Sequence, residues 1–182
     1  MSRIGIKPIT FPKEVTISLK DGVLIVKGPK GELSEKLHPY VSVKLQEGEL
    51  LVQVGKNPGK SQSAMWGTFA ALIRNMIKGV VIGFEKKLEI NGVGYGWQVS
   101  GQKVTVKAGY SHSIEVILPS GISAKVEEKA LVISGPNKQI VGETAANIRK
   151  IRLPEPYKGT GIKYQEEQIQ RKAGKQAAGA GA

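Results

Sequence analysis

The feature that most constrains this chain is an internal repeat made of two separate blocks. Segment 23–30 reads Val-Leu-Ile-Val-Lys-Gly-Pro-Lys, and segment 130–137 reads Ala-Leu-Val-Ile-Ser-Gly-Pro-Asn. A second pair of segments, 67–74 and 142–149, shares the pattern Gly-x-x-Ala-Ala-x-Ile-Arg. One such match in apolar sequence can arise by chance, but two paired blocks favour a duplication. The chain of 182 residues is long enough for the two similar domains that this predicts.

Short strands are expected in both halves, because apolar and polar residues alternate there. In the first half, the pattern predicts strands at 15–19, 23–26, 33–37, 41–45 and 50–54. In the second half, it predicts strands at 88–90 and 114–118, a hairpin over 99–106, and a strand pair formed by the residues around 126 and by 131–133. Asp21-Gly22 is typical of a two-residue hairpin turn. The spacing of the repeat blocks differs between the halves, so we expect the strands to enter the two sheets in a different order.

One amphipathic helix is expected in each half. The first would begin at a Ser61 or Ser63 cap and end at Lys78-Gly79. The second would span about 138–151. Apolar residues recur at helical spacing in both helices: Met65, Phe69, Ile73, Met76 and Ile77 in the first, and Val141, Ala145 and Ile148 in the second. Trp66 and Phe69 are better explained by packing than by base stacking.

These patterns predict an α+β fold with two similar domains from an internal duplication, each an antiparallel sheet packed against one helix. We place an N-terminal domain at 1–82 and a C-terminal domain at 83–164. Residues 165–182 form a basic segment rich in alanine, glycine and glutamine near its end. That composition cannot build a core, so we expect a flexible tail that could order on a polyanion.

The charge balance points to a polyanionic partner. The chain has 27 basic and 15 acidic residues, a net charge of +12, and the surplus is spread over both halves. The stretch 138–163 holds six basic and two acidic residues. Tyr157 and Tyr164 lie among its lysines, where each could stack on a base or pack on its own domain. The candidate RNA-binding residues are Lys138, Arg149, Arg152, Tyr157, Lys158, Lys163, Arg171, Lys172 and Lys175, with His112 as a further candidate.

Little in the sequence favours an enzyme. The chain has no cysteine and two histidines, and its acidic residues are scattered. The Gly92–Gly96 cluster leads into another strand pattern, whereas a dinucleotide-binding loop opens a helix. We therefore expect no catalytic residues, no cofactor, no metal site and no small-molecule substrate. One enzymatic alternative is a hydrolase that uses Ser111 or Ser113 with His112. Another alternative is an adaptor whose sheet edges bind acidic proteins.

No stretch approaches the roughly 20 apolar residues that a membrane helix needs. The longest apolar stretch, 64–82, is interrupted by Arg74, Asn75 and Lys78. The first eight residues do not resemble a secretory signal. We expect a soluble, cytoplasmic protein with no membrane partner.

Several motifs resemble those of the bacterial ribosomal protein L6 family of the large subunit. The resemblance covers residue 1 to about 172, and its most specific motif is Pro-Glu-Pro-Tyr-Lys-Gly-Thr-Gly-Ile at 154–162. Further matches are the start Met-Ser-Arg-Ile-Gly at 1–5, Val-Lys-Gly-Pro-Lys-Gly at 26–31, Gly-Val-Gly-Tyr at 92–95 and Gly-Tyr-Ser-His at 109–112. Three residues depart from the family pattern: Thr160, where lysine is usual, Gly96, where arginine is common, and Ser113, where proline is common.

The resemblance implies two similar α+β domains that pack on 23S rRNA. It also implies neighbouring large-subunit proteins as partners, and a position in the cytoplasmic ribosome near the sarcin–ricin loop and the stalk base, where translation factors dock. The C-terminal domain and the tail would make most of the RNA contacts. Thr160 and Gly96 are not expected to contribute phosphate contacts, because they lack the basic side chain.

Overall fold

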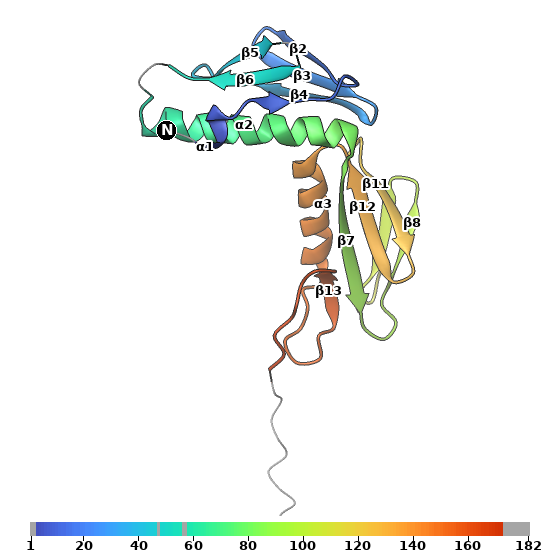
Figure 1. The fold of residues 1–182 in the computed structure, drawn as a ribbon. Coiled ribbons are helices and arrows are strands. Elements are labelled where there is room, and N and C mark those ends of the chain that lie inside the picture. The colour runs from blue at the N-terminus through green and yellow to red at the C-terminus, as the bar shows by residue number, and fades with distance from the viewer. Residues whose placement is uncertain (1–2, 47, 56–57, 173–182) are drawn as a thin grey trace, which may run out of the picture. The chain divides into compact units, whose positions relative to one another are not determined.

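The computed structural model describes residues 3–46, 48–55 and 58–172 of the chain. The chain forms two compact units (Figure 1). The N-terminal unit comprises Met1–Phe84 with Gly135–Lys138, and the C-terminal unit comprises Glu85–Ser134 with Gln139–Ala182. Both units combine antiparallel strands with one long helix, so the predicted α+β class is confirmed.

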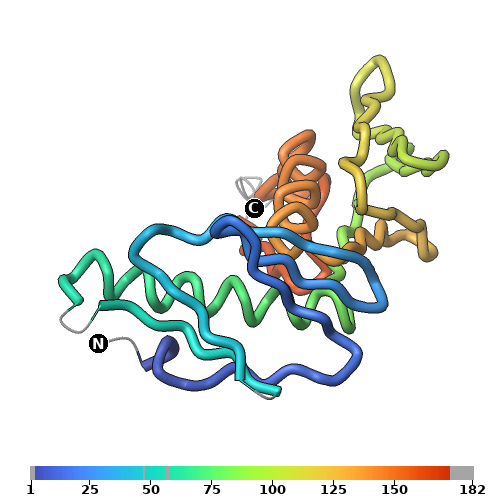
Figure 2. The backbone as a smooth tube through the Cα atoms, turned by 90° about the horizontal axis from the view of Figure 1, so that it is seen from above, coloured from blue at the N-terminus to red at the C-terminus, as the bar shows by residue number. Residues whose placement is uncertain are grey.

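The N-terminal unit places two small sheets against one long helix. The sheets have the strand orders β2-β3-β4 and β1-β6-β5. The helix α2 runs along the strands in both views of the chain (Figure 2). The elements are α1 (Arg3–Ile6), β1 (Ile9–Thr10), β2 (Thr16–Lys20), β3 (Val23–Gly28), β4 (Gly31–Lys36), β5 (Ser42–Gln46), β6 (Glu49–Gln53) and α2 (Lys60–Val81).

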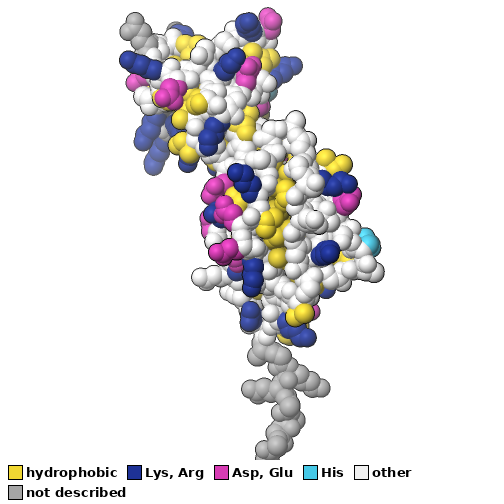
Figure 3. Space-filling model, turned by 90° about the vertical axis from the view of Figure 1, so that its right-hand side faces the viewer, with side chains coloured by type: hydrophobic (Ala, Val, Ile, Leu, Met, Phe, Trp, Pro, Cys, Tyr) yellow, Lys and Arg dark blue, Asp and Glu magenta, His cyan; other side chains and the backbone are white. Residues whose placement is uncertain are grey.

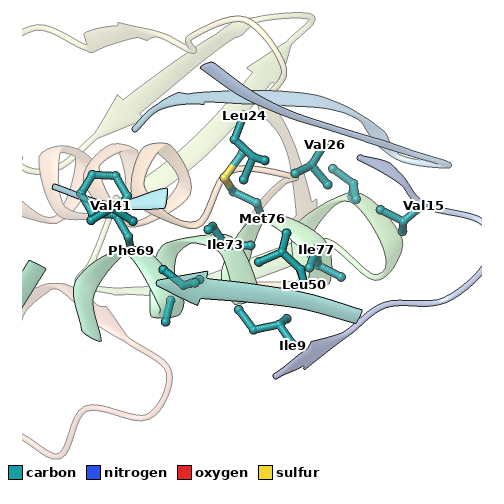
Figure 4. Close-up of a cluster of buried hydrophobic side chains, with 13 residues drawn as sticks. Ile9, Val15, Leu24, Val26, Val41, Leu50, Phe69, Ile73, Met76 and Ile77 are labelled. Atoms are coloured by element: carbon teal, nitrogen blue, oxygen red, sulfur yellow. The ribbon is translucent and has the colours of Figure 1, made fainter. Parts of the chain in front are cut away.

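The core of this unit lies between both sheets and one face of α2 (Figure 4). Leu24 of β3, Leu50 of β6 and Ile73 of α2 are completely buried. Phe69, Met76 and Ile77 also lie in this core, as their helical spacing predicts. Trp66 packs against the core, and its indole N–H donates to the Val52 carbonyl at 2.8 Å, which confirms the packing role.

Both ends of α2 differ from the prediction. The helix begins at Lys60 after a Gly59 N-cap, because Gln62 accepts a hydrogen bond from the Gly59 N–H at 3.2 Å and satisfies that donor. The predicted serine cap is therefore wrong. The helix also continues past Gly79 to Val81. The glycine with positive φ after the helix is Gly83, at 83°.

The second half of the chain contributes two more sheets and a second helix. The sheets have the strand orders β11-β12-β7-β13 and β10-β9-β8. The helix α3 spans the predicted residues. The elements are β7 (Phe84–Asn91), β8 (Gly96–Ser100), β9 (Lys103–Lys107), β10 (Ile114–Ile117), β11 (Ser123–Glu127), β12 (Ala130–Gly135), α3 (Lys138–Ile151) and β13 (Gly161–Tyr164).

The internal repeat is present in the structure residue by residue. Strands β2 and β3 pair with Ile17 opposite Val26, and β11 and β12 pair in the same register with Ala124 opposite Ile133. Side chains at matching positions are buried to the same degree: Leu24 and Leu131, Val26 and Ile133, Ala70 and Ala145, and Ile73 and Ile148 are all 0% exposed. The duplicated sequence therefore builds the same hairpin and the same helix face twice.

Candidate nucleic-acid interface

The candidate interface begins where α3 ends, at a loop over residues 152–161. The loop is closed at its base by the Ile162 N–H, which donates to the Arg152 carbonyl at 2.8 Å. Within the loop, the Glu155 N–H donates to the Thr160 carbonyl, and the Gly159 N–H donates to the Glu155 carbonyl, both at 2.9 Å. The loop is therefore internally ordered, and it holds Tyr157 and Lys158 exposed to solvent.

The chain after β13 returns to this loop. The Lys172 N–H donates to the Pro156 carbonyl at 2.9 Å. The Arg171 guanidinium lies against Gly159, since a Cβ on Gly159 would be 3.1 Å from one of its nitrogens. Arg171 and Lys172 thus join Lys158 and Arg152 in what we call the basic loop cluster: Arg152, Lys158, Arg171 and Lys172. In Figure 3, lysine and arginine side chains gather at the end of the C-terminal unit where the described chain stops.

Aromatic side chains hold one edge of this cluster. The Tyr110 hydroxyl donates to the Ile151 carbonyl at 2.9 Å, at the C-terminal end of α3. The Arg152 guanidinium lies 5.6 Å from the centre of the Tyr110 ring. Its pKa is raised, chiefly by hydrogen bonding to Tyr110 and by the nearby Tyr95. His112 is exposed, with its ring 6.4 Å from that of Tyr110. Sequence reasoning missed Tyr110, although the Gly109–His112 motif contains it.

Tyr95 is held between two glycines of the motifs that the sequence singled out. A Cβ on Gly92 would lie 2.7 Å from the Tyr95 ring, and a Cβ on Gly109 would lie 2.5 Å from the Tyr95 hydroxyl oxygen. Both glycines therefore allow the Tyr95 side chain to lie close to the backbone. The Gly92–Gly96 cluster leads into the strand β8, whereas a dinucleotide-binding loop opens a helix.

Arg149 is engaged within the protein. Its guanidinium forms a bidentate ion pair with Glu167. The Arg149 Nε donates to Oε2 at 2.9 Å, and Nη2 donates to Oε1. Both side chains are 26% exposed. Hydrogen bonding to Arg149 lowers the pKa of the Glu167 carboxyl, and the same bond raises the pKa of Arg149. The guanidinium also lies 5.6 Å from the centre of the Tyr164 ring.

Lys163 is paired as well. Its ammonium lies 3.0 Å from the carboxylate of Glu89, which stands opposite it in the β13–β7 ladder. The Lys163 side chain is 22% exposed. Arg149 and Lys163 thus each have a carboxylate partner within the protein. That partner offsets part of the positive charge of each side chain.

The remaining predicted residues lie apart from the cluster or outside the described part of the chain. Lys138 is the first residue of α3, so about 20 Å of helix separates it from Arg152. Its ammonium lies 5.8 Å from the centre of the Phe84 ring. Lys175 lies outside the described residues.

Among the described residues, no three His, Asp or Glu side chains lie where they could hold one metal ion. Ser111, His112 and Ser113 are all exposed on the loop before β10, so no enclosed site surrounds them. In the same ranges, every helix is too short or too polar to cross a membrane.

The fold defines a protein of two similar α+β units built from an internal duplication, and the second unit carries the exposed basic loop cluster. The sequence profile described as Ribosomal protein L6 matches residues 11–83 and 91–165, one segment in each half of the chain. The chain belongs to this family. The resemblance found in the sequence motifs is confirmed, and the prediction that the chain is no enzyme agrees with a family of ribosomal structural proteins.

Similar proteins come from several bacteria. The large ribosomal subunit protein uL6 of Desulforapulum autotrophicum is 49% identical over 98% of this chain and 99% of its own length. The protein of the same name from Syntrophomonas wolfei is 51% identical over 96% of this chain and 98% of its own. The protein of the same name from Crocosphaera subtropica is 49% identical over 96% of this chain and 98% of its own length. The relatives therefore match nearly the whole length of this chain.

Proposed function

We propose that this chain binds 23S rRNA as a structural constituent of the large subunit, with the C-terminal domain at 83–164 and the tail at 165–182 as its main RNA-binding parts. Its family makes it a ribosomal protein of the large subunit, and the bacterial ribosome is a cytoplasmic particle. Its partners there are rRNA and neighbouring ribosomal proteins. We further propose that it helps to organise the region near the sarcin–ricin loop and the stalk base, where translation factors dock.

The observation that carries the RNA-binding proposal is the basic loop cluster. Its members come from the end of α3, from the 152–161 loop and from the segment after β13, yet backbone hydrogen bonds bring them together. Arg152, Lys158, Arg171 and Lys172 are all exposed. Exposed basic side chains on an ordered loop neutralise phosphates and release their counterions. Such contacts fix position on the RNA rather than read its bases.

The mechanism is electrostatic clamping. Folded rRNA brings phosphates of different strands close together, and a cluster of four positive groups lowers their repulsion. Tyr157 is 57% exposed beside Lys158, where its ring can stack on an unpaired base and its hydroxyl can bind a phosphate. His112 lies at the Tyr110 edge of the cluster. Because Arg149 and Lys163 have carboxylate partners, we expect them to contribute less directly.

The test is a salt titration of binding to large-subunit rRNA. We expect Lys158→Ala and Lys172→Ala each to weaken binding and to reduce the slope of log affinity against log salt by about one unit per lost phosphate contact. The matched control is Lys125→Ala, since Lys125 is an exposed lysine on β11, at the opposite edge of the sheet from β13. Equal effects at all three positions would contradict the assignment. Binding to a protein partner that survives ribonuclease would favour an adaptor instead.

A further inference from the structure

We propose that Arg149 and Glu167 act as a positioning pair that holds the segment 165–172 in place, so that Arg171 and Lys172 reach the RNA already ordered. Neither residue needs to touch RNA in this role. The inference rests on the RNA-binding function proposed above. It assigns to an acidic residue a favourable part in binding a polyanion.

The geometry ties the segment down at three points. Where β13 ends, the Gln165 N–H donates to the Lys87 carbonyl at 3.0 Å and extends the ladder with β7. Glu167 then binds α3 through Arg149, and its carboxylate also accepts the Tyr164 N–H at 3.1 Å. At the far end, the Lys172 N–H donates to the Pro156 carbonyl. The Glu167 side chain joins this segment to the helix at a point between the two backbone anchors.

The ion pair has the features of a stable anchor. An arginine that meets a carboxylate with two parallel N–H groups fixes both direction and distance. The pair is partly shielded from solvent, and the Arg149 guanidinium stacks near the Tyr164 ring. Together these contacts restrict the segment more strongly than an exposed pair of charges would.

The internal repeat shows what is particular to this arginine. Arg74 occupies the matching position of the first repeat, at the end of the same Ala-Ala-x-Ile-Arg pattern, and it is exposed on α2. Arg149 instead has 26% side-chain exposure, because the chain after β13 folds back over it. The same residue in the same helical register is thus enclosed in the half that carries the basic loop cluster.

Two physical effects give opposite expectations for the loss of Glu167. By charge alone, the removal of an acidic group from a basic surface tightens the binding of a polyanion. By ordering, its removal frees the segment, and binding must then immobilise the long side chains of Arg171 and Lys172. We expect ordering to prevail, because the charge gained is a single group on Arg149, whose side chain is only 26% exposed, whereas disorder would affect the whole segment that carries Arg171 and Lys172.

The experiment compares Glu167→Gln with Glu166→Gln in the full-length protein. Both variants lose one negative charge at adjacent positions, and Glu166 is exposed. Affinity for purified large-subunit rRNA is measured together with amide hydrogen exchange at Lys172 in the free protein. We expect Glu167→Gln to weaken binding about fivefold or more, the cost of ordering two long side chains, and to speed exchange at Lys172. Glu166→Gln should leave exchange unchanged and bind equally well or better.

A charge-exchanged double variant, Arg149→Glu with Glu167→Arg, provides the rescue. It keeps the net charge of the wild type, and we expect it to bind better than Glu167→Arg alone, although that single variant carries two more positive charges. Binding by Glu167→Gln that equals or exceeds that of Glu166→Gln would overturn the proposal. Failure of the wild-type protein to bind rRNA would contradict the proposed function. Unchanged amide exchange at Lys172 in Glu167→Gln would contradict the positioning role, whatever the wild-type protein binds.

Discussion

At the scale of single residues, Tyr95 and its two glycines show how local backbone freedom supports the candidate interface. Gly92 and Gly109 have φ values of 152° and 75°, and both lie against the Tyr95 ring. Tyr95 in turn contributes to the raised pKa of Arg152. The two glycines thus hold a tyrosine that lies near Arg152 of the basic loop cluster.

We predict that Gly109→Ala destabilises the fold more than Gly94→Ala. The two glycines have nearly the same φ, 75° and 77°, so alanine carries the same backbone strain of about 1 kcal/mol or more at each. A Cβ at Gly94 meets nothing within 4 Å, whereas one at Gly109 would lie 2.5 Å from the Tyr95 hydroxyl. We expect an added cost of about 1–3 kcal/mol from overpacking, measured by urea unfolding. Equal losses in the two variants would show that Tyr95 moves freely.

At the scale of elements, β13 shows the limit of pattern reading. The strand spans Gly161–Tyr164 and adds an edge to the sheet of β7, yet the residues around it are mostly turn formers. Ile162 is its one fully buried aliphatic side chain, and a single apolar residue cannot show the alternation that predicts a strand. The strand exists because β7 offers an edge and because Gly161 lies against the Leu153 carbonyl, where a Cβ would be 2.6 Å away.

The contact between α3 and the segment after β13 should depend on pH. The pKa of Glu167 is lowered in the folded protein, mainly by Arg149. A lowered carboxyl pKa contributes stability above the pKa of the unfolded chain, and this contribution is lost as the pH falls through the folded value. We therefore predict that wild type is more stable than Glu167→Gln at neutral pH, and that the difference shrinks in acid. The free energies of unfolding of both proteins are measured from neutral to acid pH. A difference between wild type and Glu167→Gln that stayed constant with pH would contradict the prediction.

At the scale of the whole molecule, the duplication gives each unit its own buried core. Ile73 of α2 and Ile148 of α3 occupy matching positions and are both completely buried. Because their burial is equal, substitutions at these two positions allow the stability of the two units to be compared.

We predict that Ile73→Ala and Ile148→Ala each cost about 2–5 kcal/mol, because each leaves a cavity beneath a sheet. The loss should be local: amide exchange should quicken mainly in the unit that holds the variant. Measuring exchange across all strands in both variants provides the control for each. Equal acceleration throughout the chain in either variant would show that the units unfold together.

The sequence determined the elements that repeat or alternate. Both hairpins, both helix faces and the α+β class follow from apolar spacing, because burial at fixed periods leaves its mark on the residues themselves. Membership of the family followed from motifs such as residues 154–162. The surplus of positive charge also followed, although charge counts alone do not show which groups are free.

The tertiary structure decided which strands share a sheet and which basic residues have partners. Strand pairing depends on contacts between residues far apart in the chain, which a local period does not encode. The candidate RNA-binding residues differ in the same way. Arg149 is paired with Glu167, and Lys163 is paired with Glu89. Arg171 and Lys172 instead lie beside the 152–161 loop. An ion pair requires two side chains to meet in space, and only the folded chain brings them together.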